Sequence, residues 1–404
     1  MWAGRPGPPP GGSERAARSW LFLWRAPAVR AALYQSVLVL LFAVLLGAAV
    51  LDVRANMQAR GIPTGLGFLD NAAGFDINQT LIAYNARSTY ARALLVGLLN
   101  TGLVCAVALV FATIIGFTVG LARLSRNLVI AHGALVYVEA LRNVPLLLQL
   151  LFWYNAVLKP LPPPRESLLL LPGVYLNNRG FFLPEPHFGP DAPWLGVGLG
   201  LSLVGAALGW RSFRRARRKP ASVDLPVGEV AGGAILCLAL VAFALTDEPF
   251  NLTAPVLKGF NFNGGIRLSP EFAALVLGLS LYTGAFIAEI VRAGVAAVPH
   301  GQSEAAAALG LAQGPAFRLV IAPQAMRVII PLLTSQYLNL IKNSSLAVFI
   351  GYPDLVQVFA GTVLNQTGAA VQVIFITMTV YLAISLLISL AMNLYGRRFA
   401  LVER

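Results

Sequence analysis

The segment Glu304–Pro323, EAAAALGLAQGPAFRLVIAP, decides how the rest of this 404-residue chain is interpreted. It is rich in alanine and reads as two short helices joined by a turn, yet strongly apolar segments flank it on both sides. Ser303 is a candidate N-cap and Gly310 a left-handed stop, so the first helix is about two turns long. Such short helices are unstable in water even when rich in alanine. Packing must therefore hold this one, against either the rest of this chain or the surface of another protein.

Three further residues of the segment fit the same interpretation. Glu304 is expected in the first helical turn, where the helix dipole favours an acidic side chain. Pro315 suits the first position of a second helix. Pro323 is expected to break or bend that second helix before the next apolar segment. The segment thus predicts a helix, a turn and a second helix outside the apolar part of the chain.

The composition places the chain in a membrane. Hydrophobic residues make up 57% of the sequence and charged residues only 12%, which is more apolar than a soluble globular chain. The net charge is +13, but the arginines flank apolar segments rather than forming a face with aromatic residues, as a nucleic-acid surface would. The positive charge is therefore interpreted as a topology signal.

Apolar segments long enough to cross a bilayer, which takes about 20 residues, recur along the chain. They lie near 32–51, 93–121, 132–158, 194–210, 228–246, 271–291, 326–346 and 371–394. The fourth is short, and Pro145 interrupts the third, where it kinks a helix or ends a preceding interfacial one. The expected fold is an all-α polytopic membrane protein with about eight transmembrane helices.

The distribution of Lys and Arg predicts the orientation, because cytoplasmic loops carry an excess of them. With the N-terminus inside, the cytoplasmic segments hold 19 of these residues and the opposite side holds 9. The inner segments are 1–31, 122–131, 211–227, 292–327 and 395–404, and the outer ones are 52–92, 159–193 and 247–270. Both termini and the segment Glu304–Pro323 are therefore predicted in the cytoplasm.

Two parts of this arrangement carry further expectations. No A-x-A-like cleavage site follows the first apolar segment, so 1–31 is expected to be an uncleaved cytoplasmic tail. The cluster RSFRRARRKP at 211–220 is expected to anchor the topology and to bind nothing more specific than anionic lipid.

With this topology, the opening segment resembles the cytoplasmic loop of ATP-binding-cassette (ABC) importer permeases. The family pattern is E-A-A, three residues, Gly, nine residues, and then I-x-L-P. The residues that match in spacing are Glu304, Ala305, Ala306, Gly310 and Pro323. Val320 and Ala322 stand where the pattern has Ile and Leu, so in both positions one apolar residue replaces another.

The flanking sequence narrows the resemblance. AFIAEIVRAGVAAVPHGQSEAAAALG, YVEALRNVPLLLQLLFWY and IKNSSLAVFIGYPDL resemble the polar amino-acid uptake branch of these permeases. The long outer stretch that begins at GIPTGLGFLDNAAGF and the insertion at about 159–270 resemble one permease subunit of the general L-amino acid transporter. The resemblance covers nearly the whole chain.

This resemblance implies an ABC type I importer permease core in a bacterial inner membrane. The E-A-A helix would be a coupling helix that docks on a separate ATPase dimer, with small alanines allowing close approach and Gly310 allowing the turn. The implied partners are that ATPase, a second permease subunit in a heterodimer or homodimer, and a periplasmic amino-acid-binding protein. ATP would be used by the ATPase, and no cofactor or metal is expected on this chain.

The sequence itself supports a non-enzymatic role. It contains no G-x-x-x-x-G-K-[ST] motif, and none of its four lysines follows a glycine, as a phosphate-binding loop requires. The three histidines, His132, His187 and His300, are scattered and form no catalytic arrangement with a Ser or Cys nucleophile. No catalytic residue is predicted.

Polar groups at membrane depth are the best pointers to a solute path, because burying them costs free energy that a ligand or partner usually offsets. The candidates are Lys342, Asn343, Ser344 and Ser345 in the seventh apolar segment, with Gln149 and Tyr282 as weaker ones. Lys342 either lines the path or extends to the headgroups. Glu139 and Arg142, at positions i and i+3, are predicted to form a structural ion pair.

These predictions divide the chain into five parts. They are a tail (1–31), a first transmembrane helix with an outer segment (32–92), the first part of the core (93–158), an insertion with two transmembrane helices (159–270), and the second part of the core (271–404) with its E-A-A loop at about 292–325.

Two other functions stay open at this point. An ion-coupled secondary amino-acid transporter would also be polytopic, but the chain shows neither an internal repeat nor a series of acids at membrane depth. A permease for a different small solute would share the same loop. The sequence does not rank the amino acids that would be carried.

Overall fold

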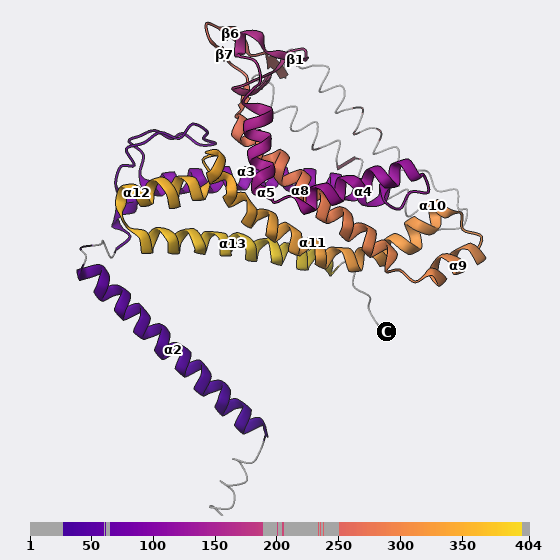
Figure 1. The fold of residues 1–404 in the computed structure, drawn as a ribbon, viewed down its shortest axis with the longest axis horizontal. Coiled ribbons are helices and arrows are strands. Elements are labelled where there is room, and N and C mark those ends of the chain that lie inside the picture. The colour runs from indigo at the N-terminus through magenta and orange to yellow at the C-terminus, as the bar shows by residue number, and fades with distance from the viewer. Residues whose placement is uncertain are drawn as a thin grey trace, which may run out of the picture.

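The computed structural model describes residues 27–59, 65–188 and 250–397, together with the isolated positions 61, 200, 204, 205, 233, 235 and 237. This part of the chain is mostly helical (Figure 1). Five of its helices are long and apolar enough to cross a membrane, and a bent helix pair makes a sixth if it counts as one span. The five are α2 (Pro27–Ala59), α3 (Tyr90–Ala122), α8 (Pro270–Ala296), the run Gln313–Ile350 and α13 (Ala370–Gly396).

These six units coincide with six of the expected apolar segments. The remaining two expected spans, 194–210 and 228–246, fall almost entirely outside the described residues. The same holds for the basic cluster at 211–220 and for most of the tail, because α2 begins at Pro27.

The helices form an elongated bundle in which the two ends differ (Figure 1). Helices α3, α8, α11 (Ala322–Ser344) and α13 run side by side, and α9 (His300–Ala308) with α10 (Gln313–Ala316) lies at one end. The opposite end carries segment 65–89, which includes η1 (Gly67–Asp70), and α12 (Leu364–Thr367), which follows η6 (Val356–Val363). Helix α2 projects away from the bundle, and none of the residues in its most apolar stretch is buried.

Small residues on α3 let α8 approach closely. A Cβ atom on Gly116 would lie 2.4 Å from Cβ of Ile287, and one on Gly120 would lie 2.7 Å from the carbonyl oxygen of Ala288. Glycines spaced by four residues lie on one helix face, and such small-residue faces pack closely between membrane helices. Residues of α3 and α8 accordingly form a large part of the main buried cluster, together with residues of α5 (Leu146–Leu151) and α11.

Pro145 bends the third apolar segment sharply. Helix α4 (Leu128–Asn143) ends before it, and α5 (Leu146–Leu151) with the π-helical η2 (Phe152–Leu158) continues at 103° to α4. The residue before a proline is pushed out of the helical region, and Val144 is extended at φ −96° and ψ 128°. The predicted interruption at Pro145 is confirmed.

The insertion contains short strands that the sequence interpretation as an all-α chain did not include. One antiparallel sheet has the order β1-β2-β3-β8, β4 pairs with β5, and β6 pairs with β7. The strands are β1 (Leu168–Leu171), β2 (Val174–Asn177), β3 (Gly180–Leu183), β4 (Glu185–Phe188), β5 (Phe250–Thr253), β6 (Val256–Lys258), β7 (Asn261–Asn263) and β8 (Ile266–Leu268), with η3 (Pro164–Glu166) before β1. They lie where α5 and η2 lead away from the bundle and α8 begins (Figure 1).

The pairing of β3 with β8 closes this insertion onto the start of α8. Phe182 stands opposite Arg267 in the register, and the Phe182 ring packs 5.0 Å from the Phe262 ring. Gly180 has φ 116°, and a Cβ there would lie 2.0 Å from the carbonyl oxygen of Leu268, so only glycine fits. The consequence is that the β2–β3 turn lies beside the first turn of α8.

Hydrogen bonds hold segment 65–89 against the first turn of α3. The Thr89 side chain caps α3 by accepting from the Arg92 backbone N–H at 3.3 Å, and Arg92 Nε donates to the Ala83 carbonyl oxygen at 2.6 Å. Tyr84 Oη donates to the Phe75 carbonyl oxygen at 3.2 Å. Burial, with a smaller contribution from the nearby Asp76 carboxylate, raises the pKa of Tyr84 to about 12, so the phenol stays protonated as a donor.

Candidate functional site

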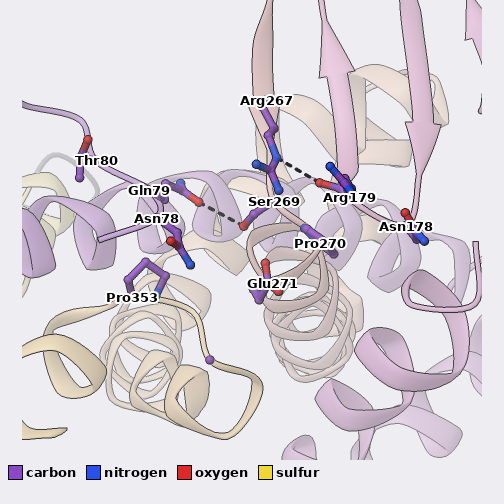
Figure 2. A pocket seen from close by; sticks show the side chains of 11 residues that line it. Asn78, Gln79, Thr80, Asn178, Arg179, Arg267, Ser269, Pro270, Glu271 and Pro353 are labelled. Atoms are coloured by element: carbon purple, nitrogen blue, oxygen red, sulfur yellow. Dashed lines mark hydrogen bonds between the residues drawn. The ribbon is translucent and has the colours of Figure 1, made fainter. Parts of the chain in front are cut away.

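Two regions are candidates for function, and they lie in different parts of the structure. The first is the hook, defined here as residues 300–323, at the end formed by α9 and α10 (Figure 1). The second is the strand-side cavity, which lies between the insertion and the start of α8 (Figure 2).

The first helix of the hook starts earlier than the sequence predicted. Helix α9 begins at His300, directly after Pro299, and no side chain caps it. The prediction that Ser303 is the cap is therefore wrong, because the chain is already helical three residues before it. Glu304 consequently lies in the second turn, where its carboxylate is 3.4 Å from Nδ1 of His300 and its side chain is 74% exposed.

The first helix ends as predicted at Gly310. This residue has φ 74°, and a Cβ there would meet nothing within 4 Å. Its N–H donates to the Ala307 carbonyl oxygen at 2.9 Å, and the Leu311 N–H donates to that of Ala306 at 3.0 Å. This pair of bonds is a Schellman motif, which satisfies the last carbonyls of the helix and requires a left-handed residue.

Helix α9 has one face against its own chain and another directed outward. Ala306 is only 2% exposed, whereas Leu309 is 81% exposed. The Gln302 carbonyl oxygen Oε1 accepts from Gln324 Nε2 at 3.1 Å, which joins α9 to the start of α11. The outward face consists of Glu304, Ala305, Ala307, Ala308 and Leu309. Packing within the chain thus holds the short helix and leaves a small-residue face exposed.

The second helix of the hook also differs in detail from the prediction. Helix α10 begins at Gln313, so Pro315 is its third residue rather than its first. The π-helical η4 (Phe317–Ile321) follows, and Pro323 is the second residue of α11. The helical run continues through Pro323 to Ile350. The expected break is absent: Pro323 directly follows the π-helical η4, and the change from π- to α-helical bonding there accommodates its missing N–H within one helical run.

An ion-pair network holds the helix that leads into the hook. Glu289 on α8 pairs with Arg123, the residue after α3, and accepts from Nη2 of Arg292 at 2.6 Å. This network joins the ends of α3 and α8 only seven residues before Pro299. This network was not predicted from the sequence, although the i, i+3 spacing of Glu289 and Arg292 is a usable signal.

The ion pair predicted between Glu139 and Arg142 does not form. Glu139 Oε2 instead accepts from Asn143 Nδ2 at 3.3 Å. The Arg142 guanidinium lies over the Phe286 ring at 5.1 Å from its centre. The aromatic ring belongs to α8, so the tertiary contact has replaced the local pair.

The four polar residues predicted in the seventh apolar segment mark a change of helix type. Helix α11 ends at Ser344, and the 3₁₀-helical η5 (Ser345–Ile350) continues the run. Ser344 is 1% exposed and its hydroxyl donates to the Ile341 carbonyl oxygen at 2.7 Å. Lys342 is exposed, and Asn343 and Ser345 are half-buried. Of the four, Lys342 and Asn343 have side chains available to a solute.

The two weaker candidates have structural surroundings. Gln149 Nε2 donates to the carbonyl oxygens of Leu141 and Val144, both at 2.9 Å, and so holds the end of α4 at the bend. The Tyr282 ring packs 4.9 Å from the Phe286 ring on the same helix. None of the six predicted path residues lines the strand-side cavity.

The strand-side cavity has a volume of about 640 Å³ and a mainly polar wall (Figure 2). Four segments that are distant in sequence contribute to it. Its lining residues are Asn78, Gln79, Thr80, Asn178, Arg179, Arg267, Ser269, Pro270, Glu271, Gly351 and Pro353. Three of these segments fall in or next to the ranges that the charge count places on the outer side, and Gly351 with Pro353 follows the seventh expected span, which alternation leads to the same side.

Hydrogen bonds join three of these segments beneath the cavity. Asn100 on α3 is fully buried, and its Nδ2 donates to the carbonyl oxygens of Gln79 at 2.8 Å and Pro353 at 2.9 Å. Tyr352 Oη donates to the Asn100 carbonyl oxygen at 3.2 Å. The Ser269 hydroxyl, which caps α8, lies 3.2 Å from Gln79 Oε1 and donates to it (Figure 2). The cavity therefore has a fixed base.

Both signs of charge line the wall. Arg267 Nε donates to the Arg179 carbonyl oxygen at 3.2 Å, so the two arginines lie side by side (Figure 2). Glu271 lies in the first turn of α8, and its Oε1 accepts from Tyr154 Oη at 2.8 Å. From the sequence, Arg179 and Arg267 were predicted only to be among the positive residues of the outer segments. The one signal for these two arginines in the sequence was that they lie in outer segments, where Lys and Arg are less frequent than in inner ones.

Comparison with known proteins gives consistent similarities. The family model of the binding-protein-dependent transport system inner membrane component matches residues 112–400. The chain is 48% identical to the putative amino-acid ABC transporter permease protein YhdX of Escherichia coli (strain K12), over 94% of this chain and 96% of that protein. It is 46% identical to the general L-amino acid transport system permease protein AapQ of Rhizobium johnstonii, over 94% of each chain.

A third relative and one solved structure complete the comparison. The glutamate/glutamine/aspartate/asparagine transport system permease protein BztB of Rhodobacter capsulatus is 40% identical, over 92% of this chain and 93% of that protein. A crystal structure of an amino acid ABC transporter with histidines matches 76% of this chain and 95% of its own, at 22% identity and a TM-score of 0.46.

Proposed function

This chain belongs to the family of binding-protein-dependent transport system inner membrane components, and from that premise we propose which solutes it carries and how its two polar sites act. It is a multi-pass inner-membrane permease of an ABC importer. The proposed cargo is L-amino acids, of broad or polar range. Support comes from relatives at 40–48% identity whose names describe amino-acid transport.

The hook is proposed to couple the permease to a separate ATPase. Its outward face is built from alanines with one acidic residue, Glu304, and the Schellman motif at Gly310 fixes how that face is presented. Small side chains let a partner surface come close to the helix backbone. The observation that carries this proposal is that only Ala306 of the E-A-A helix is buried in its own chain. Glu304, Ala305, Ala306, Gly310 and Pro323 are the proposed coupling residues.

Movement of the hook would reach the spans through rigid connections. Gln302 is bonded to Gln324 at the start of α11, and the Glu289 network joins α3 to α8 just before the hook. ATP binding and hydrolysis would take place in the ATPase dimer, and this chain would have no catalytic role. It would hold no cofactor or metal of its own.

The remaining assembly is proposed from the same family membership. A second permease subunit would complete the path, and curated relatives include permeases that share a system name, such as BztB and BztC of Rhodobacter capsulatus. A heterodimer is therefore favoured over a homodimer. A periplasmic binding protein would deliver the solute, and both termini would lie in the cytoplasm, as the charge count of 19 to 9 predicts.

The test is to purify the complex through a tag on this chain and identify its subunits by mass spectrometry. We expect an ATPase and a second permease, and uptake of radiolabelled L-amino acids into proteoliposomes that depends on ATP and on the loaded binding protein. Uptake driven by an ion gradient without ATP would contradict the proposal in favour of a secondary transporter.

A further inference from the structure

We infer that the strand-side cavity is a receiving site for a free α-amino acid on its way from the binding protein into the path, with its carboxylate at Arg179 and Arg267 and its ammonium at Glu271. The inference rests on the proposed function and adds a site to it. None of the residues that carry it lies in the hook or in the polar break at 342–345.

The carboxylate side of the site has two guanidinium groups. Arg179 and Arg267 are both exposed at the cavity, and the bond from Arg267 Nε to the Arg179 backbone holds them together. Arginine presents a planar set of donors that matches a carboxylate. The positive end of helix α8 is already matched by the acidic Glu271 in its first turn. Both arginines favour a negative group.

The ammonium side is set by Glu271. Glu271 is the one acidic residue among the described residues that line the cavity. Its Oε1 accepts a hydrogen bond from Tyr154 Oη. An anion without a positive group would be repelled by this carboxylate at the short distances within one cavity. A zwitterion places each of its charges opposite its complement. The wall thus selects the part of the solute that all α-amino acids share.

The volume of the cavity and a further polar atom in its wall suit a site that accepts amino acids with different side chains. A volume of about 640 Å³ falls within the range typical of small-molecule sites and exceeds what one small solute fills, so side chains of different length can be accommodated. Asn178 Oδ1 is buried and has no hydrogen-bond partner among the described residues. Buried acceptors of this kind are usually satisfied by water or a ligand. A hydrogen-bond donor on the side chain of the solute can satisfy this oxygen.

The fixed base explains why such a site would be coupled to transport. Asn100 bonds Gln79 and Pro353, so the cavity is anchored to α3 and to the loop that follows η5. Ser269 begins α8, whose other end leads to the hook. A solute bound between these segments contacts the outer ends of the same helices that the ATPase would move.

The test uses the complete transporter, with the double variant R179Q/R267Q and the single variant Glu271→Gln. The control is Arg87→Gln, which removes an exposed arginine from segment 65–89 outside the cavity. Three quantities are measured for each: uptake of radiolabelled L-glutamine into proteoliposomes, affinity of the loaded binding protein for the complex, and direct binding of L-glutamine to the purified complex without binding protein.

We expect the double variant to lose about tenfold or more in uptake and in direct binding, because two charge-assisted contacts are removed. Affinity for the loaded binding protein should stay unchanged, and the Arg87 control should behave as wild type. In the wild-type complex, the decarboxylated analogue of glutamine should not compete for direct binding. Glu271→Gln should weaken the binding of L-glutamine, but it should not weaken the binding of an analogue that lacks the ammonium group, because the repelling carboxylate is gone.

Two results would overturn the inference. One is wild-type uptake and binding in the double variant while the wild-type complex transports normally. The other is a loss of uptake fully explained by weaker docking of the binding protein, which would make this face a protein contact. A wild-type complex that carries no L-amino acid at all would instead overturn the proposed function.

Discussion

Leu311 donates its backbone N–H to the carbonyl oxygen of Ala306 at 3.0 Å, and this bond closes the exposed helix of the hook. It can form only because Gly310 between them adopts φ 74°. The direction in which the chain leaves α9 is therefore fixed by one glycine, and the outward face of α9 is presented at that angle.

Gly310→Ala is expected to reduce coupling by strain alone. The site has room for a methyl group, but a left-handed conformation costs an L-residue about 1–2 kcal/mol, which corresponds to about a fivefold or greater loss of the docked state. The matched control is Gly301→Ala on the same helix, where there is equal room and no positive φ. ATP hydrolysis stimulated by the loaded binding protein is measured at equal membrane abundance. Equal activity of the two variants would refute the coupling role of Gly310.

Glu304→Arg is expected to weaken association with the ATPase. The side chain is 74% exposed, so the substitution reverses a charge on the outward face without disturbing a buried contact. Glu304→Gln separates loss of the charge from its reversal and should have the smaller effect. Copurification of the ATPase and uptake are measured together. Wild-type values for both in Glu304→Arg would remove this residue from the interface.

Asn343→Leu is expected to lower amino-acid uptake while assembly with the ATPase is unchanged. Asn343 is half-buried at the junction of α11 and η5, so its amide is available to a solute. The comparison variant is Ser344→Ala, which removes a buried hydroxyl that donates to the Ile341 carbonyl oxygen and also bonds Cys105 and Tyr381, so its main effect should be on stability, at about 1 kcal/mol. Uptake kinetics are compared for several amino acids. An unchanged rate and substrate range in Asn343→Leu would exclude this segment from the path.

Gly116→Ala is expected to destabilise the bundle. The added methyl would lie 2.4 Å from Cβ of Ile287, and such overpacking typically costs about 1–3 kcal/mol. Gly133→Ala on α4, where a Cβ meets nothing within 4 Å, should instead be neutral or stabilising, since alanine is the better helix former. Thermal unfolding of the two purified variants decides the point. A melting temperature for Gly116→Ala at or above that of wild type would show that α3 and α8 are less closely packed.

Reporter fusions test the predicted orientation. A reporter that is active only in the cytoplasm should be active after Lys219 or Arg404 and silent near Asn71 or Asn177. The reason is the excess of Lys and Arg in the segments assigned to the inside. Asn177 lies in β2 beside the strand-side cavity, so its fusion also reports on which side that cavity opens. Activity at Asn71 would reverse the whole arrangement.

Local sequence signals predicted several features correctly because their physical causes are local. Gly310 ends α9, and Pro145 ends α4 by forcing Val144 out of the helical region. Apolar length predicted the six span units in the described residues, since crossing a bilayer sets a minimum run of apolar residues. The E-A-A spacing identified the hook for the same reason, because the helix and its glycine stop lie within a few residues of each other.

Tertiary contacts decided the rest. Ser303 does not cap α9, because the chain leaving α8 is already helical after Pro299, and Arg142 turns from Glu139 to a ring on α8. Arg179 and Arg267 are 88 residues apart and meet only through the pairing of β3 with β8. No periodicity in the sequence encodes such a contact. The register of the strands determines this contact, as close packing determines how α3 meets α8, and both depend on which side chains can be buried together in three dimensions.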